Sequence, residues 1–262
     1  MNFKDSRVWI TGASSGIGEA LAVAFHQAGA RLILSARREE ELKRVQAACG
    51  GGPNTRVLPL DVSHSDELAE KARAALAMFG AIDILVLNAG ISQRALARAT
   101  DDSVYRRLME VNFFGPEAIA RAVLPSMLEK KSGHFVVISS IAGKFGVPLR
   151  TGYSATKFAL HGFFEALRAE EERNGIRVTL VCPGYIRTEI SVAALKGDGS
   201  PHAKLDPELA RGMPTEECAR QILQAVARGK QEIVVGAARE KAFVYLKRFF
   251  PGVLARMIGR AR

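Results

Sequence analysis

The stretch TGASSGIG, residues 11–18, decides which fold the rest of the chain adopts. It follows a short apolar run, RVWI, and leads into an alanine-rich helical stretch, GEALAVAFHQAGA. Its three glycines, Gly12, Gly16 and Gly18, allow a tight turn and a close approach of the backbone to a pyrophosphate. A helix that begins there offers free N–H groups and a positive dipole end. This strand–turn–helix context predicts a dinucleotide site; the alternative is a glycine turn that only packs helix on strand.

Outward from this turn, apolar runs and helical stretches alternate along the chain. The runs are continuous, as expected for strands buried on both faces of a sheet. They are RVWI, RLILSA, RVLPLDV, IDILVLNAG, HFVVISS, IRVTLVCPG and EIVVG. We therefore expect one Rossmann-like α/β domain over residues 1–262, a doubly wound parallel sheet of about seven strands with helices on both faces. One long helical region is expected at about 101–130, and the long polar segment 185–214 is expected to form a substrate lid loop.

The composition is that of an ordinary globular protein, with 48% hydrophobic and 24% charged residues among 262. The three cysteines are far apart and form no CxxC pair, which argues against a disulfide framework and favours a reducing cytoplasm. The five histidines show no metal-ligand spacing, so no metal is expected. We expect neither a signal peptide nor a membrane-spanning segment.

The net charge of +10 is concentrated at the C-terminal end. Residues 239–262 hold seven Lys or Arg and one Glu, which accounts for six of the ten excess charges. This distribution argues against a nucleic-acid partner. Residues 237–262 are predicted to form a basic amphipathic C-terminal extension. It would either lie on an anionic membrane surface or pack over the substrate cleft or a subunit interface.

The end of the second apolar run carries a cofactor signal. An acidic residue there binds the ribose 2′-hydroxyl of NAD, whereas an arginine accommodates the 2′-phosphate of NADP. Here Ser35 and Ala36 are followed by Arg37 and Arg38. We therefore expect NADP(H) to be preferred over NAD(H), the alternative being that both arginines are solvated charges at a helix start.

Tyr153 and Lys157 lie four residues apart in TGYSATKFAL. On a helix this spacing places both side chains on one face, where they can meet at a common site. A nearby ammonium favours the phenolate and lowers the pKa of a tyrosine. The pair is a candidate acid/base, although such a spacing also arises by chance.

Several motifs occur together in order: TGASSGIG, LNAG at 87–90, Asn112, ISSIAG at 138–143, Tyr153 with Lys157, and PGYIRT at 183–188. In this combination the sequence resembles the short-chain dehydrogenase/reductase family. Stretches such as NAGIS, VNFFGP and PGYIRTEISV resemble the dehydrogenase/reductase 7 group and its bacterial relatives within it.

The resemblance implies a catalytic set. Tyr153 would be the general acid/base, and Lys157 would lower its pKa and hold the nicotinamide ribose. Ser140 would form a hydrogen bond with the substrate oxygen, whereas Ser139 would point to the other face of the strand. Asn112 would complete a proton relay through water.

The resemblance also implies a cofactor cleft. Asp61 would meet the adenine, and the Ile186 backbone and Thr188 would contact the nicotinamide amide. The family usually has a second asparagine where Leu87 stands, a departure that touches no catalytic group. The expected cofactor-binding residues are Gly12, Ser14, Ser15, Gly16, Ile17, Gly18, Arg37, Arg38, Asp61, Val62, Asn88, Ala89, Gly90, Tyr153, Lys157, Pro183, Gly184, Ile186 and Thr188.

These residues together predict an NADP(H)-dependent oxidoreductase that acts on a carbonyl or secondary alcohol. The apolar lid residues 192–195 suggest an apolar substrate of lipid or steroid-like size. Two alternatives stay open: a cofactor-binding regulatory protein, and a membrane-surface interaction protein in which the extension dominates. The apolar stretch FALHGFFEALRAE after Lys157 also predicts a homodimer or homotetramer.

Overall fold

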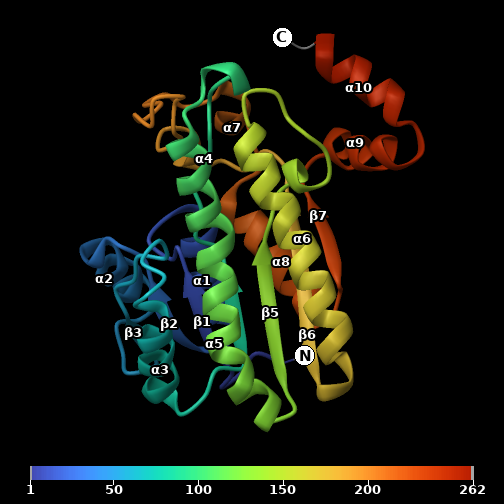
Figure 1. Cartoon of the computed structure of the whole chain (residues 1–262). Helices are drawn as coiled ribbons and strands as arrows, with labels where there is room; N and C mark the ends of the chain where they lie inside the picture. Colours follow the sequence, from blue (N-terminus) through green and yellow to red (C-terminus); the bar gives the residue numbers. More distant parts are fainter. Residues whose placement is uncertain (1, 261–262) are drawn as a thin grey trace.

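Seven parallel strands form one sheet, in the order β3-β2-β1-β4-β5-β6-β7, in this computed structural model (Figure 1). The structure describes residues 2–260. The strands are β1 (Arg7–Thr11), β2 (Arg31–Ser35), β3 (Thr55–Val57), β4 (Ile84–Leu87), β5 (Gly133–Ile138), β6 (Ile176–Pro183) and β7 (Glu232–Val235). The strand order reverses between β1 and β4, which confirms the expected doubly wound sheet and places the topological switch point there.

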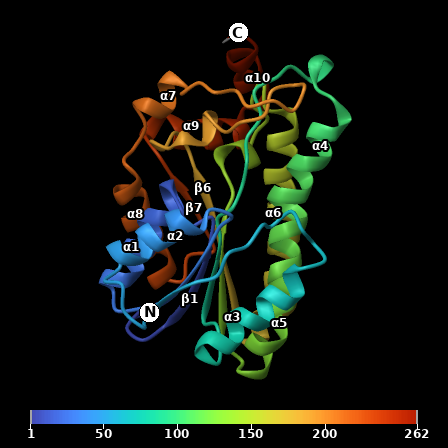
Figure 2. The ribbon, with the colours of Figure 1, turned by 90° about the vertical axis from the view of Figure 1, so that its left-hand side faces the viewer.

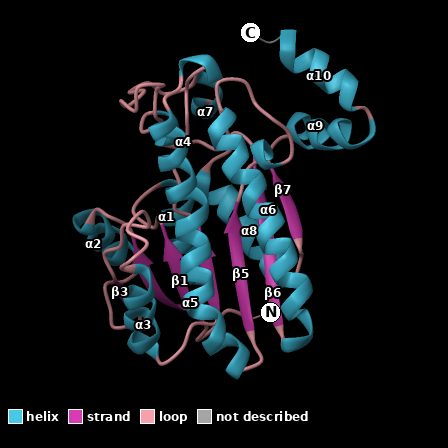
Figure 3. Cartoon of the chain, viewed as in Figure 1, coloured by secondary structure: helices cyan, strands magenta, loops and turns pink. Residues whose placement is uncertain are grey.

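Helices cover both faces of the sheet (Figures 2 and 3). One layer holds α1 (Gly16–Gln27), α2 (Glu39–Ala48) and α8 (Thr215–Ala227), and the other holds α3 (Leu68–Phe79), α5 (Gly115–Glu129) and α6 (Thr151–Glu171). Strand side chains alternate between two cores: Val8 and Ile10 of β1 pack in the first layer and Trp9 in the second. Both faces are therefore apolar, which explains the continuous apolar runs in the sequence.

The carboxyl ends of the central strands meet at one edge of the sheet. Thr11, the last residue of β1, pairs in register with Ser35 of β2. Its hydroxyl accepts hydrogen bonds from the backbone N–H groups of Asn88 and Ala89, which follow β4. This arrangement brings the glycine turn and the NAG segment side by side.

The expected helical region at 101–130 is interrupted. It consists of α4 (Asp102–Met109), a π-helical turn (Glu110–Phe114) and α5. A π turn holds one extra residue in the helix and often occurs at functional sites. Here it turns Asn112 inward, where its side chain is fully buried. Helical periodicity in a sequence does not reveal a single extra residue within one turn, so this π turn could not be predicted from the sequence.

Two further helices, α9 (Ala238–Phe249) and α10 (Pro251–Arg260), form the C-terminal extension (Figure 1). Phe250 breaks the helix with non-helical dihedral angles, and Pro251 starts the next one. The inner faces of both helices pack on Ile141 and Phe145 near the end of β5. The last two residues of the expected extension, 261–262, lie outside the described part of the chain. No helix among residues 2–260 is long and apolar enough to cross a membrane.

Candidate active site

A cleft of about 530 Å³ runs along the carboxyl edge of the sheet at the switch point. Nearly every residue that the sequence singled out lines it: most of the glycine turn, Arg37 and Arg38, Asp61 and Val62, residues 88–90, Ser140, Tyr153, Lys157, Pro183, Gly184, Ile186 and Thr188. Gly18 and Asn112 do not line it. The folded chain therefore brings together residues from five separate motifs.

The glycine turn places the first turn of α1 at the cleft. Gly12 and Gly16 have positive φ angles of 65° and 60°, which side-chain-bearing residues rarely adopt. Gly18 serves packing instead, because a Cβ there would collide with the carbonyl of Gly12. Ser15, the N-cap of α1, makes no side-chain cap hydrogen bond, so the helix start keeps N–H groups available for an anion.

Two arginines border the cleft beyond the end of β2. Nη2 of Arg38 donates to the hydroxyl oxygens of Ser14 at 3.2 Å and Ser15 at 3.3 Å, so Arg38 lies against the glycine turn. Burial acts to raise the pKa of Asp61, but hydrogen bonds from Ser63 and the charge of Arg37 outweigh it and lower the pKa. A positive end of the cleft, formed by Arg37 and Arg38, thus faces an ionised Asp61.

Tyr153 and Lys157 lie one turn apart on α6, and both are buried. Nζ of Lys157 lies 5.6 Å from the centre of the Tyr153 ring and donates to the carbonyl oxygen of Ile138 at 2.8 Å. Burial lowers the pKa of Lys157 to about 8. The ammonium is thus held at the end of β5, beside the phenol.

The phenol of Tyr153 has a raised pKa because burial disfavours the phenolate. The hydrogen bond with Ser140 and the charges of Arg150 and Arg94 act in the opposite direction. The sequence analysis names Lys157 as the cation that lowers the pKa of Tyr153. It does not identify Arg94 or Arg150.

The two serines at the end of β5 both border the cleft, but their hydroxyls have different partners. The hydroxyl of Ser139 donates to the backbone oxygen of Lys157 at 3.2 Å and so binds α6. Ser140 accepts from the N–H of Ala142 at 3.1 Å and lies within 3.4 Å of the Pro183 oxygen. Of the two hydroxyls, only that of Ser140 acts on the pKa of Tyr153, which it lowers.

Asn112 lies behind the cleft wall rather than on it. Its Oδ1 accepts from the N–H of Ile91 at 2.8 Å, and its Nδ2 donates to the Ile91 oxygen at 2.9 Å and to the Thr156 hydroxyl at 3.1 Å. These bonds join the π turn to the segment after β4 and to α6. The role in a proton relay stays a prediction.

The lid, residues 185–214, closes one side of the cleft. Val192 and Ala193 line the cleft, whereas Ala194 and Leu195 are buried and do not line it. Only half of the apolar stretch 192–195 therefore lines the cleft. Further apolar lining residues come from the lid itself (Ile186, Ile190 and Leu209) and from outside it (Ile91 and Val111).

One cluster of possible metal ligands occurs in the described part of the chain. Ligand atoms of His161, Cys182 and Glu232 lie within 4.8 Å of one another. Burial raises the pKa of the Cys182 thiol to about 12, and Lys144 forms an ion pair with Glu232 at 2.7 Å. Both features oppose metal binding, because a metal needs the thiolate and a free carboxylate. The absence of a metal stays a prediction.

The cleft fits a dinucleotide in its donor groups. Uncapped N–H groups and the Ser14 and Ser15 hydroxyls suit a pyrophosphate, and the Arg37 and Arg38 end suits a further phosphate. The other end offers Lys157 and Tyr153.

Comparison with known proteins agrees with this geometry. The family model for the short chain dehydrogenase matches residues 6–198. A "Dehydrogenase/reductase SDR family protein 7-like" of Drosophila melanogaster is 43% identical over 252 residues, which is 94% of this chain and 77% of that protein.

Solved structures show the same architecture. A short chain dehydrogenase from Burkholderia cenocepacia, solved in complex with NADP, is 26% identical with a TM-score of 0.82, over 98% of this chain and 99% of that one. A short chain dehydrogenase/reductase from Burkholderia phymatum, solved in complex with NAD, has a TM-score of 0.84 at 24% identity, over 95% and 94%. The latter likeness bears on the fold alone.

Proposed function

The chain belongs to the short-chain dehydrogenase/reductase family of nicotinamide-dependent oxidoreductases, and we propose that it uses NADP(H) to interconvert an apolar carbonyl compound and its secondary alcohol. The observation that carries this proposal is the placing of Ser140, Tyr153 and Lys157 on one wall of the cleft. A protein that only binds the cofactor would have no need for all three groups at one point.

The positive end of the cleft supports NADP(H) over NAD(H). Ser35 and Ala36 end β2 with no acidic group for a ribose 2′-hydroxyl, and Arg37 and Arg38 follow on the cleft wall. Arg38 is already held against the glycine turn, so its guanidinium is positioned for a phosphate. The NADP complex of the Burkholderia cenocepacia relative accords with this assignment.

The chemistry divides between cofactor and chain. When bound, the nicotinamide supplies or takes the hydride at the carbonyl carbon. Tyr153 holds the proton that the carbonyl oxygen receives, and the hydroxyl of Ser140 donates a hydrogen bond to the same oxygen. Lys157 holds the ribose beside them and keeps a positive charge near the phenol. Each such group typically contributes about a hundredfold or more in rate.

The cleft wall supports an apolar substrate. Ile190, Val192, Ala193 and Leu209 line the cleft from the lid side. Two charged residues, Arg107 and Glu189, also line the cleft.

The outer face of the C-terminal extension supports contact with an anionic lipid surface. Tyr245, Phe249 and Phe250 are 67%, 68% and 62% exposed, and Val253 and Met257 are exposed beside them. The exposed cations of the two helices are Arg239, Lys241, Lys247, Arg248 and Arg256. Aromatic rings between cations suit a membrane interface, whereas two copies of this face would repel each other.

Association of copies is proposed through α6. Its outward stripe of Ala155, Phe158 and Gly162 is exposed, and Phe114 of the π turn is exposed as well. The three cysteines are buried and unpaired, which fits a reducing cytoplasm.

The test is oxidation of NADPH and NADH by the purified protein over a panel of ketones, diketones, steroids and acyl carbonyls. We expect turnover that requires NADPH and favours apolar ketones. Tight NADPH binding without turnover across the panel would instead support the cofactor-binding regulatory protein.

A further inference from the structure

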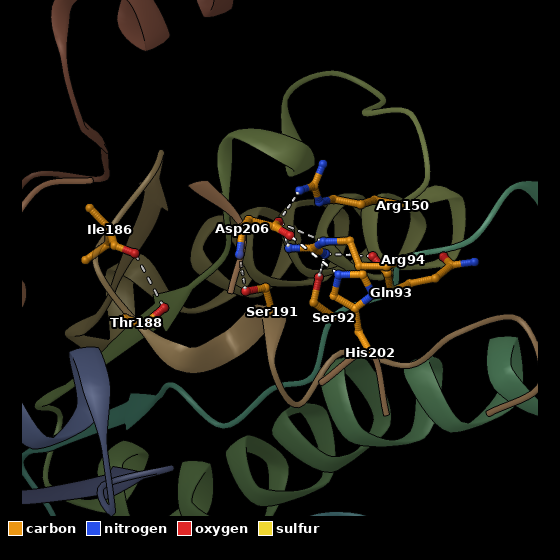
Figure 4. A network of polar contacts seen from close by, with 9 residues as sticks. All are labelled: Ser92, Gln93, Arg94, Arg150, Ile186, Thr188, Ser191, His202 and Asp206. Atoms are coloured by element: carbon orange, nitrogen blue, oxygen red, sulfur yellow. Dashed lines mark hydrogen bonds and ion pairs between the residues drawn. The ribbon is translucent and has the colours of Figure 1, made fainter. Parts of the chain in front are cut away.

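Three charged side chains that are far apart in sequence meet at the lid (Figure 4). Arg94 follows β4, Arg150 directly precedes α6, and Asp206 lies in the lid. Oδ2 of Asp206 accepts from Nε and Nη2 of Arg94 at 2.8 and 2.6 Å, and from Nη2 of Arg150 at 3.0 Å. One carboxylate oxygen thus holds two guanidinium groups.

The Arg94–Asp206–Arg150 cluster is largely shielded from water. The three side chains are 7%, 14% and 18% exposed, respectively. Arg94 is fixed further, because its Nη1 donates to the Ser92 hydroxyl and to the Gln93 oxygen, both at 2.7 Å. Ion pairs in such surroundings are screened less by solvent and salt than surface pairs.

Backbone bonds join the same three segments. The N–H of Leu195 in the lid binds the Ser92 oxygen, and the N–H of Arg94 binds the Leu195 oxygen. The buried Gln93 side chain accepts from the N–H of Gly152, in the first turn of α6. The lid is therefore attached to the turn of helix that carries Tyr153.

We propose that Asp206 is a positioning residue for the reaction: by binding Arg94 and Arg150 it holds the lid over the cleft and fixes two positive charges beside Tyr153. This inference rests on the proposed function, in which Tyr153 is the acid/base. Asp206 is not among the residues that line the cleft, and its carboxylate binds the two arginines, so it acts through them.

Removing the carboxylate has a defined electrostatic consequence. The cations near the phenol of Tyr153 are Arg94, Arg150 and Lys157. Arg107 and Glu189 line the cleft. His202 lies 3.8 Å from Asp206. Asp206→Asn keeps the shape and leaves both guanidinium charges without their anion. Arg94 stays in place through Ser92 and Gln93, so the phenolate is favoured more than in the wild type.

The test compares Asp206→Asn with Asp198→Asn, an exposed lid aspartate that binds only Ser200 in its own turn. The first readout is the pH profile of kcat/KM for ketone reduction, which needs the protonated phenol. In Asp206→Asn the lower pKa of Tyr153 should move the alkaline limb of this pH profile to lower pH. In Asp198→Asn the limb should not move. We also expect the substrate KM to rise by about tenfold to a hundredfold as the lid loosens.

A second readout does not need turnover. Amide hydrogen exchange of lid residues 191–206 in the NADPH-bound protein should become faster in Asp206→Asn, and in Arg150→Gln, which breaks the cluster from the other side. Faster exchange would support the lid role even if no substrate were found and the proposed function failed. If Asp206→Asn and Arg150→Gln are folded and match Asp198→Asn in exchange, KM and pH profile, the inference is wrong.

Discussion

At the scale of single residues, burial shifts the pKa values of both Tyr153 and Lys157. Burial raises the pKa of the phenol and lowers that of the ammonium to about 8, so it favours the neutral form of both groups. A protonated Tyr153 at neutral pH is ready to give a proton to a developing alkoxide. The cations around it, Arg94 and Arg150 included, keep the phenolate accessible when the proton leaves.

Arg37→Glu tests the cofactor assignment. An acidic side chain at the positive end of the cleft repels a 2′-phosphate and can accept a hydrogen bond from a 2′-hydroxyl. We expect the KM for NADPH to rise by about tenfold or more while that for NADH rises little or falls. Steady-state kinetics with both cofactors measure this, and Arg73→Glu on the exposed side of α3 is the matched charge control. Equal effects on both cofactors would contradict the assignment.

Asp83→Asn tests the ion pairs at the amino edge of the sheet. Burial acts to raise the pKa of Asp83, but hydrogen bonds from Arg7 and Lys130 outweigh it and hold the pKa well below its usual range. A carboxylate with a depressed pKa stabilises the fold at pH values above its unfolded-state pKa of about 4. This contribution to stability is lost as the pH falls. We expect the variant to lose about 2–3 kcal/mol in urea unfolding at neutral pH.

The difference in the free energy of unfolding between the wild type and Asp83→Asn should become smaller as the pH is lowered toward about 4 and below, where unfolded carboxyls take up protons. Asp66→Asn, an exposed aspartate, is the control and should cost little at either pH. A deficit for Asp83→Asn that stayed constant with pH would show that the carboxylate charge does not stabilise the fold.

The candidate catalytic residues could be named from the sequence because Ser140, Tyr153 and Lys157 lie in short local motifs. The Arg94–Asp206–Arg150 cluster could not, because Arg94 and Asp206 are separated by 112 positions and no spacing rule connects them. Such a contact exists only once the lid has folded back on the sheet.

At the scale of elements, the π turn Glu110–Phe114 depends on one side chain. Asn112 satisfies both the N–H and the carbonyl of Ile91 and reaches Thr156 on α6. Asn112→Ala leaves these buried backbone groups without partners, so we expect a loss of about 1–3 kcal/mol in the free energy of unfolding. Urea unfolding measures this, with the exposed Asn174→Ala as control. Equal stability of the two variants would mean that water replaces the amide.

Strands and helices could be predicted from periodicity to within a few residues, and the departures have physical causes. The run RVLPLDV predicts a longer third strand, whereas β3 extends only over Thr55–Val57. The N–H groups of Leu58 and Leu60, on either side of Pro59, still donate to Leu34 and Ala36, so the pairing loosens rather than stops there. Phe250 and Pro251 divide the C-terminal extension into two helices.

At the scale of the whole molecule, charge and exposed aromatic rings gather on α9 and α10. We expect the full chain to bind vesicles that contain anionic lipid and to release them as salt rises above about 0.15 M. Replacing Tyr245, Phe249 and Met257 of the outer face by serine should abolish most of this binding. Sedimentation with vesicles of anionic or neutral lipid measures it.

This triple variant is preferable to a truncation before α9, because the inner faces of the two helices cover Ile141 and Phe145. Serine at Phe114 and Phe158, which are also exposed but lie away from the extension, is the matched control. Equal binding by the wild type and the triple variant would show that the outer face of the extension does not bind a membrane surface.

The central claim is that Tyr153 is the acid/base of an NADP(H)-dependent oxidoreductase. The most direct test is Tyr153→Phe on the best substrate of the carbonyl panel, with NADPH binding measured by fluorescence on the same preparation. For Tyr153→Phe we expect unchanged NADPH affinity and a kcat/KM lower by about a hundredfold or more, because the ring still fills its site and only the phenolic hydroxyl with its proton is missing. Turnover at the wild-type rate would contradict it.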